Sequence, residues 1–77
     1  MGTDKDLLAL GREIRRHRKP AGISQEELAD RAGLHRNYIG FLERGERNPR
    51  VKTLFQVARA LDMRFAELVA DVMEPKR

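Results

Sequence analysis

Apolar residues recur at helical spacing along the whole chain, and no stretch alternates apolar and polar residues as a strand would. Glycine and proline interrupt this pattern at short intervals, which limits each helix to a few turns. The sequence therefore predicts an all-α fold of five short helices. The expected helices span roughly residues 4–19, 25–32, 36–44, 51–61 and 65–73.

Local end signals define the second and third of these helices. Ser24 followed by Glu27 is typical of a capping box, in which the serine hydroxyl accepts a hydrogen bond from the Glu27 amide. Gly33 tolerates the positive φ that often ends a helix. Two short helices joined by residues 33–35 have the spacing of a helix-turn-helix, whose core is expected at about residues 24–43.

The length of 77 residues favours one domain covering residues 1–77. A domain of this size is only marginally stable, so small chains usually add disulfides, metals or partners. The absence of cysteine excludes disulfides and cysteine metal sites, and neither histidine has carboxylates at a metal-binding spacing. We therefore expect no metal and no other cofactor, and oligomerisation remains as the source of added stability.

Positive charge is segregated along the chain, which has a net charge of +4. Residues 12–19 and 31–52 each carry +4, whereas residues 20–30 carry −3. This pattern suits a surface that binds a polyanion, and charge alone fits a solvated basic surface equally well. No apolar run approaches the ~20 residues that span a bilayer, so we expect a cytoplasmic protein without membrane contact.

The helix expected at 36–44 begins with donors suited to the major groove of DNA. Arginine can pair with guanine through two hydrogen bonds, and asparagine can do the same with adenine. The alternative is that Arg36 and Asn37 are ordinary solvated residues. No catalytic group of side chains accompanies Ser24, which serves as a helix cap, so an enzyme is not expected.

Several motifs at fixed spacing resemble one family, the DNA-binding proteins of Cro/cI (XRE) type. They are GISQEELA at 22–29, AGL at 32–34, Tyr38-Ile39, LERG at 42–45, RNP at 47–49, Thr53-Leu54 and ARAL at 58–61. The similarity extends from about Leu10 to Leu68 and is greatest to the controller proteins of restriction–modification systems. It implies a five-helix, lambda-repressor-like domain that binds a palindromic operator in double-stranded DNA as a homodimer.

The resemblance also implies roles for single residues. The Gln25 position holds a phosphate, the positions of His35, Arg36 and Asn37 contact bases, and the loop after the third helix lies over the DNA backbone or the centre of the site. The expected DNA-binding residues are Gln25, His35, Arg36, Asn37, Tyr38, Arg44, Arg47 and Asn48. The family pattern further implies a partly buried salt bridge between Arg18 and Glu43.

Three positions, His35, Phe41 and Arg50, depart from the family pattern, and Arg50 stands where a serine commonly caps the fourth helix. His35 stands where many relatives have a serine or threonine cap, and histidine caps a helix less well. Phe41 replaces a residue that is often polar, so it either touches a thymine methyl group or packs within the protein.

Surplus apolar residues in the last two helices predict the dimer interface. These residues are Phe55, Val69, Val72 and Met73. The dimer would regulate transcription by occupying a promoter or, from an upstream site, by recruiting RNA polymerase. The alternative is a helix-turn-helix antitoxin that binds a toxin protein and represses its own operon, although few residues after Met73 remain to cover such a partner.

Overall fold

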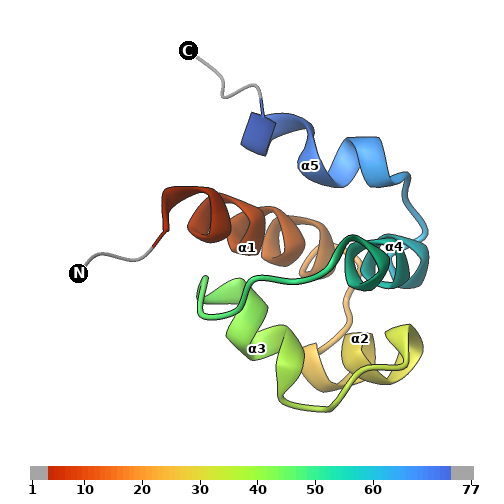
Figure 1. Ribbon diagram of the computed structural model, residues 1–77. Helices are drawn as coiled ribbons and strands as arrows, with labels where there is room; N and C mark the ends of the chain where they lie inside the picture. Colours follow the sequence, from red (N-terminus) through yellow and green to blue (C-terminus); the bar gives the residue numbers. More distant parts are fainter. Residues whose placement is uncertain (1–3, 74–77) are drawn as a thin grey trace.

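The computed structural model describes residues 4–73, which form five α-helices and, within that range, no strand (Figure 1). The helices are α1 (Lys5–Arg18), α2 (Gln25–Ala32), α3 (Tyr38–Glu43), α4 (Val51–Ala60) and α5 (Phe65–Met73). The all-α prediction is confirmed. The predicted domain runs from residue 1 to residue 77, and its ends, 1–3 and 74–77, lie outside the described residues.

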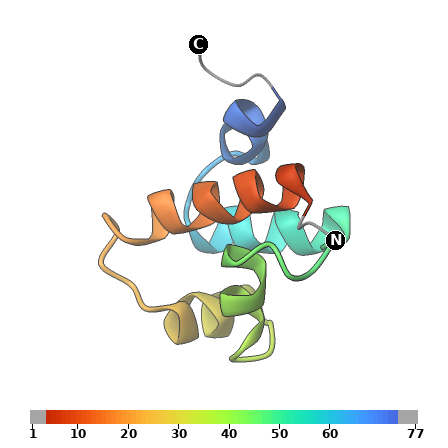
Figure 2. The same ribbon diagram turned by 90° about the vertical axis from the view of Figure 1, so that its left-hand side faces the viewer.

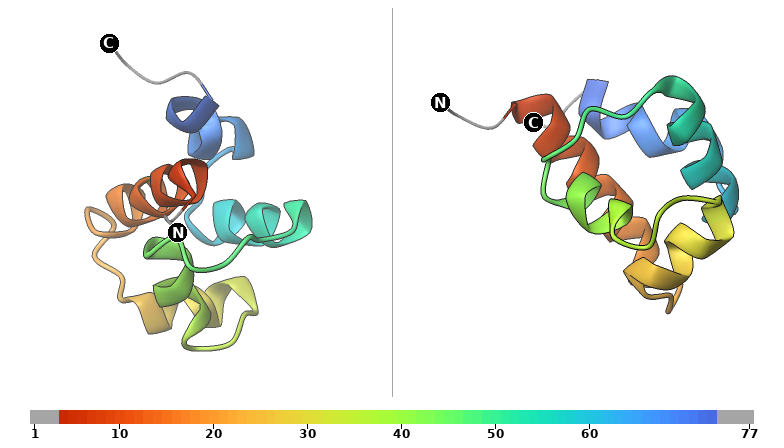
Figure 3. Two further views of the ribbon diagram at one scale, coloured as in Figure 1. Left: turned by 60° about the vertical axis from the view of Figure 1, so that its left-hand side comes forward. Right: turned by 60° about the horizontal axis from the view of Figure 1, so that its bottom comes forward.

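The helices are stacked so that α1 and α4 separate α5 from the α2–α3 pair. Helix α1 packs against both α3 and α5, and α2 packs against α3 and α4. Figures 1 and 2 show α5 at one end of the molecule and α2 and α3 at the other, and Figure 3 (left) shows the same order. Across residues 4–73, each helix is too short or too polar to cross a bilayer.

All five helices contribute to one core. The largest fully buried side chains are Ile14, Leu28, Ile39, Leu42, Val57 and Leu68. These residues come from the predicted helical stripes, with at least one from each helix. The burial of each stripe fixes which face of its helix remains exposed to solvent.

The predicted end signals of α2 are confirmed. The Ser24 hydroxyl oxygen accepts a hydrogen bond from the Glu27 amide at 2.9 Å. Gly33 has a φ of +73°, and the Leu34 amide donates to the Ala29 carbonyl at 2.8 Å. These contacts satisfy polar groups at both ends of the helix, so α2 has the length expected from the sequence.

Helix α3 is shorter than the predicted span of residues 36–44. It begins at Tyr38, so Arg36 and Asn37 lie in the preceding turn and not in the first turn of the helix. Asn37 makes no side-chain cap, and its own amide donates to His35 Nδ1 at 3.2 Å. The Asn37 side chain, at the N-cap position, therefore accepts no hydrogen bond from the first helical amides, and a turn stands where the sequence predicted the first helical residues.

Gly11 sets how closely α1 approaches the end of α3. A Cβ atom added at Gly11 would lie 2.6 Å from the Glu43 carbonyl oxygen and closer still to the Leu42 carbonyl oxygen. Both obstacles are backbone atoms, which cannot turn aside as a side chain can. The absence of a side chain therefore brings the two helices together and places Glu43 next to α1.

Candidate nucleic-acid interface

A shallow hollow between α2 and α3 collects half of the residues that were expected to bind DNA. Its lining includes Gln25, Arg36, Asn37 and Arg44, together with Glu26, Gly40 and Phe41. The four predicted residues come from the start of α2, the turn before α3 and the end of α3. The fold thus brings together side chains that are up to 19 positions apart (44 − 25).

The other predicted DNA-binding residues lie around this hollow or behind it. Arg47 and Asn48 are exposed in the loop that follows α3, and His35 is exposed in the turn before it. Tyr38 is half-buried and packs against the core. This position favours a role for Tyr38 in anchoring α3 over a role in contacting DNA.

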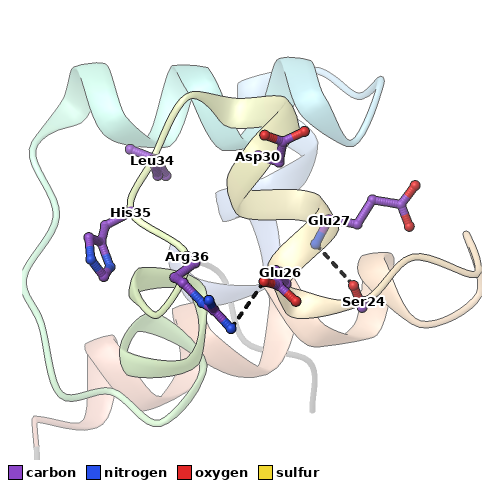
Figure 4. Close-up of a pocket in the computed structure, with 7 residues that line it drawn as sticks. All are labelled: Ser24, Glu26, Glu27, Asp30, Leu34, His35 and Arg36. Carbon is purple, nitrogen blue, oxygen red and sulfur yellow. Dashed lines mark hydrogen bonds and ion pairs between the residues drawn. The ribbon is translucent and has the colours of Figure 1, made fainter.

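Arg36 extends toward α2 and pairs with Glu26. Its Nη2 atom lies 3.2 Å from Glu26 Oε2, and the two side chains are 69% and 64% exposed (Figure 4). An ion pair this exposed contributes little free energy, because water and salt screen both charges. Arg36 can therefore leave Glu26 for a guanine edge or a phosphate at small cost.

The opposite side of the α2–α3 turn is acidic. Figure 4 shows a second open hollow there, which is lined by the carboxylates of Glu26, Glu27 and Asp30 together with Ser24, Leu34, His35 and Arg36. Within residues 4–73, no group of three or more histidine, aspartate or glutamate side chains is arranged to hold a metal ion. Three carboxylates repel phosphate, so this side of α2 is unsuited to contact with the DNA backbone.

A buried ion pair between Arg18 and Glu43 holds the end of α1 against the end of α3. Arg18 Nε lies 2.6 Å from Glu43 Oε2, and Arg18 Nη2 lies 3.0 Å from Oε1. The two side chains are only 9% and 3% exposed, and Arg18 Nη1 also donates to the Ile23 carbonyl at 3.0 Å. The hydrogen bond to Glu43 raises the pKa of the Arg18 guanidinium above its ordinary value. These are the residues that the family pattern implied would pair.

Gln25 joins this ion pair from the start of α2. Its Nε2 atom donates to Glu43 Oε1 at 2.9 Å, and the side chain is half-buried. Glu43 therefore holds one residue from α1 and one from α2 at the end of α3. The sequence did not indicate this second contact, because nothing local to Gln25 shows which carboxylate would face it.

Phe41 contacts two of the predicted DNA-binding arginines. The guanidinium carbon of Arg47 lies 4.4 Å from the ring centroid, and that of Arg44 lies 5.3 Å away. From the sequence, Phe41 either touches a thymine methyl group or packs within the protein. The spacing of Arg44 three positions after Phe41 is the one local signal of such a contact, since residues i and i+3 are neighbours on a helix.

Three of the predicted dimer residues, Val69, Val72 and Met73, lie on α5 at the far end of the molecule, Phe55 lies on α4, and the exposure of the four differs. Met73 is 74% exposed and Phe55 is 39% exposed, with the Phe55 ring meeting that of Phe65 edge-on at 5.0 Å. Val69 and Val72 are half-buried and pack against the core. The surplus of apolar surface expected from the sequence is therefore smaller at the two valines than at Met73.

Several known proteins are similar to this chain in sequence and in fold. A family model described as Helix-turn-helix matches residues 14–68. Control protein C.SmaI of Serratia marcescens is 43% identical over 65 residues, which cover 84% of this chain and 75% of C.SmaI. The HTH-type transcriptional regulator y4dJ of Sinorhizobium fredii is 42% identical over 65 residues, covering 84% of each chain.

Solved structures agree with these matches. The crystal structure of the restriction-modification controller protein C.AhdI from Aeromonas hydrophila has a TM-score of 0.83 to this chain at 42% identity, covering 84% of this chain and 98% of C.AhdI. Such proteins are regulators of transcription and not enzymes. The chain therefore belongs to the helix-turn-helix family of Cro/cI (XRE) type and is a DNA-binding transcriptional regulator related to restriction–modification controller proteins.

Proposed function

We propose that this protein is a homodimer that binds a palindromic operator in double-stranded DNA. The observation that supports the proposal most is the hollow between α2 and α3, where Gln25, Arg36, Asn37 and Arg44 present hydrogen-bond donors on one surface. Arginine and asparagine are the side chains that distinguish guanine and adenine in the major groove. Helix α5, with exposed Met73, lies at the opposite end and leaves this surface free.

We assign different tasks to the residues of this surface. Arg36 and Asn37 lie in the exposed turn that leads into α3, where they would enter the groove first and contact base edges. Arg44, Arg47 and Asn48 follow α3 and would meet the DNA backbone. Contacts to phosphates set position and affinity, whereas contacts to bases set specificity.

Gln25 and His35 would take part at the edges of the same surface. Gln25 is the first residue of α2, where backbone amides also point toward an approaching phosphate. The His35 ring is exposed, and its Nδ1 atom is engaged by the Asn37 amide. The remaining ring nitrogen is the group that His35 would offer to DNA.

Regulation would follow from occupancy of the operator. In a dimer, the two α3 helices would lie in successive major grooves about 34 Å apart. Binding over a promoter would repress it, and binding upstream would recruit RNA polymerase. Because C.SmaI and C.AhdI are named as controller proteins, we propose control of a restriction–modification system as the role of this chain, at the nucleoid in the cytoplasm.

Selection of bound duplexes from a random pool, followed by footprinting on the selected site, tests this function. We expect an inverted repeat whose half-sites are about 10–10.5 base pairs apart, protected on one face of the duplex. A pool that shows no enriched sequence, or a single half-site without symmetry, would contradict the proposal. Mutation of one half-site is the matched control, and it should weaken binding without abolishing the footprint on the other half.

A further inference from the structure

Phe41 provides the one apolar side chain that lines the α2–α3 hollow. It nevertheless lies within 5.3 Å of the guanidinium carbons of both Arg44 and Arg47. A guanidinium within about 6 Å of an aromatic centroid is attracted by the negative face of the ring. Phe41 is half-buried, so these contacts are partly shielded from water.

Each arginine is also held by a second contact. Arg44 Nε donates to Glu46 Oε1 at 3.1 Å, and Arg47 Nη1 donates to the Glu46 carbonyl at 3.0 Å. Gly40 leaves room for this arrangement, because a Cβ atom there would lie 3.1 Å from Arg44 Nη1. The two guanidiniums are thus gathered at the end of α3 before any DNA is present.

We propose that Phe41 is a positioning residue that holds Arg47 and Arg44 ready to bind the DNA backbone. The inference rests on the proposed function, in which these two arginines contact DNA. Long arginine side chains lose rotamer freedom when they bind, and side chains that are already ordered lose less. The ring lowers that loss for two phosphate contacts without touching the DNA itself.

The stacking can be tested in the free protein, with no assumption about DNA. Protons above an aromatic ring are shifted upfield in NMR spectra, so the Cδ protons of Arg47, and to a smaller degree those of Arg44, should resonate upfield of free arginine. Phe41→Leu should remove these shifts, whereas Phe41→Tyr should keep them. Random-coil arginine shifts in the unaltered chain would overturn the proposal.

Titration of DNA tests the consequence. Phe41→Leu should weaken binding about three- to tenfold for operator and scrambled duplexes alike, because the loss concerns backbone contacts. The slope of affinity against salt should stay unchanged, since no charge is removed. Phe41→Tyr should retain the affinity of the unaltered chain, because it keeps the ring.

A background that lacks both arginines distinguishes positioning from direct contact. At low salt, where nonspecific binding is strong, adding Phe41→Leu to Arg44→Ala/Arg47→Ala should have no further effect. A persisting loss, or a loss confined to sites with one particular thymine, would show that the ring contacts DNA itself and would overturn the proposal.

Two controls separate a loss of folding and a failure of the proposed function from a failure of the stacking. Melting of Phe41→Leu, followed by circular dichroism, should match that of the unaltered chain, and Phe41→Met replaces it if the leucine variant does not fold. If the unaltered chain shows the upfield shifts but binds no duplex at any salt concentration, the proposed function fails while the stacking stands.

Discussion

Within residues 4–73, the arginines that pair with carboxylates fall into two groups according to how exposed the pair is. Arg18 is buried with Glu43, whereas Arg36 and Arg44 are exposed and lie beside carboxylates that are equally exposed. An exposed pair exchanges its partner for a phosphate with little change in free energy, and a buried pair cannot. The first group therefore holds the fold together, and the second is available to DNA.

The exposed arginines should differ in what they contribute to DNA binding. We expect Arg36→Ala to bring affinity for the operator toward the nonspecific level with little change in salt slope, because a guanine contact is worth roughly 1–3 kcal/mol of discrimination. Arg44→Ala should weaken operator and scrambled DNA alike and lower the salt slope by about one unit. Titration of both variants at several salt concentrations measures these effects.

Arg31→Ala serves as the control for this comparison, since Arg31 pairs with Glu27 on the acidic side of α2. Its removal should leave the ratio of operator affinity to scrambled-DNA affinity unchanged, unlike Arg36→Ala, and should lower the salt slope by less than Arg44→Ala does. Equal losses of both affinities for Arg36→Ala would mean that the turn before α3 does not contact bases.

The buried pair predicts a large effect on stability. Glu43→Ala should lower the free energy of unfolding by about 3 kcal/mol, because it leaves the Arg18 guanidinium buried without its partner. The Gln25 amide would lose its acceptor at the same time. Urea denaturation at one fixed protein concentration measures the change, since a dimer's apparent stability depends on concentration.

Glu27→Ala is the matched control for Glu43→Ala. Glu27 also pairs with an arginine, but both side chains are about half exposed, so the loss should stay below about 1 kcal/mol. The same small loss for Glu43→Ala would show that its pair with Arg18 is not needed to hold α1 against α3.

At the scale of single elements, the sequence predicted what local chemistry determines. The ends of α2 depend on Ser24 and Gly33, and both act on residues within four positions of themselves. The predicted start of α3 at residue 36 was wrong, because no side chain caps a helix there. A turn closed by the hydrogen bond from the Asn37 amide to His35 Nδ1 precedes the helix, which begins at Tyr38. Such a turn is one of several conformations that the residues before Tyr38 allow.

Contacts between elements were harder to predict than the elements themselves. The importance of Gly11 depends on backbone atoms more than 30 positions away (42 − 11 = 31), and the contact of Gln25 with Glu43 depends on how α2 meets α3. No periodic pattern contains this information. The salt bridge of Arg18 was expected because a family pattern records such long-range pairs, whereas helical spacing does not.

The packing of α1 on α3 leads to a prediction for Gly11. Gly11→Ala should destabilise the protein by about 1–3 kcal/mol, since the new methyl group meets two backbone carbonyls and outweighs the higher helix propensity of alanine. Gly40→Ala is the control, because a Cβ atom there meets only the ends of the Arg44 and Gln25 side chains, which can move. Thermal unfolding compares the two variants, and a stable Gly11→Ala would mean that α1 does not pack this closely.

At the scale of the whole molecule, the two candidate binding surfaces lie at opposite ends. The residues predicted to bind DNA lie on and around α2 and α3, and α5 lies beyond α1 (Figures 1 and 2). A dimer formed through α5 would leave both α3 helices uncovered. It would also fix the distance between them, which is the requirement for recognising two half-sites of set spacing.

Met73 offers the clearest test of this dimer. It is 74% exposed, whereas Val69 and Val72 pack against the core and Phe55 meets Phe65, so changing those residues would also disturb the monomer. We expect the unaltered chain to sediment at micromolar concentration with twice the mass of an 8.9 kDa chain. Met73→Asp should weaken association by about tenfold or more, because an unpaired carboxylate is costly to bury. Arg36→Ala, at the far end, should leave the dimer intact.

Sedimentation of the unaltered chain as a monomer, or no effect of Met73→Asp, would place the interface elsewhere, and the symmetry of the operator would then need another origin.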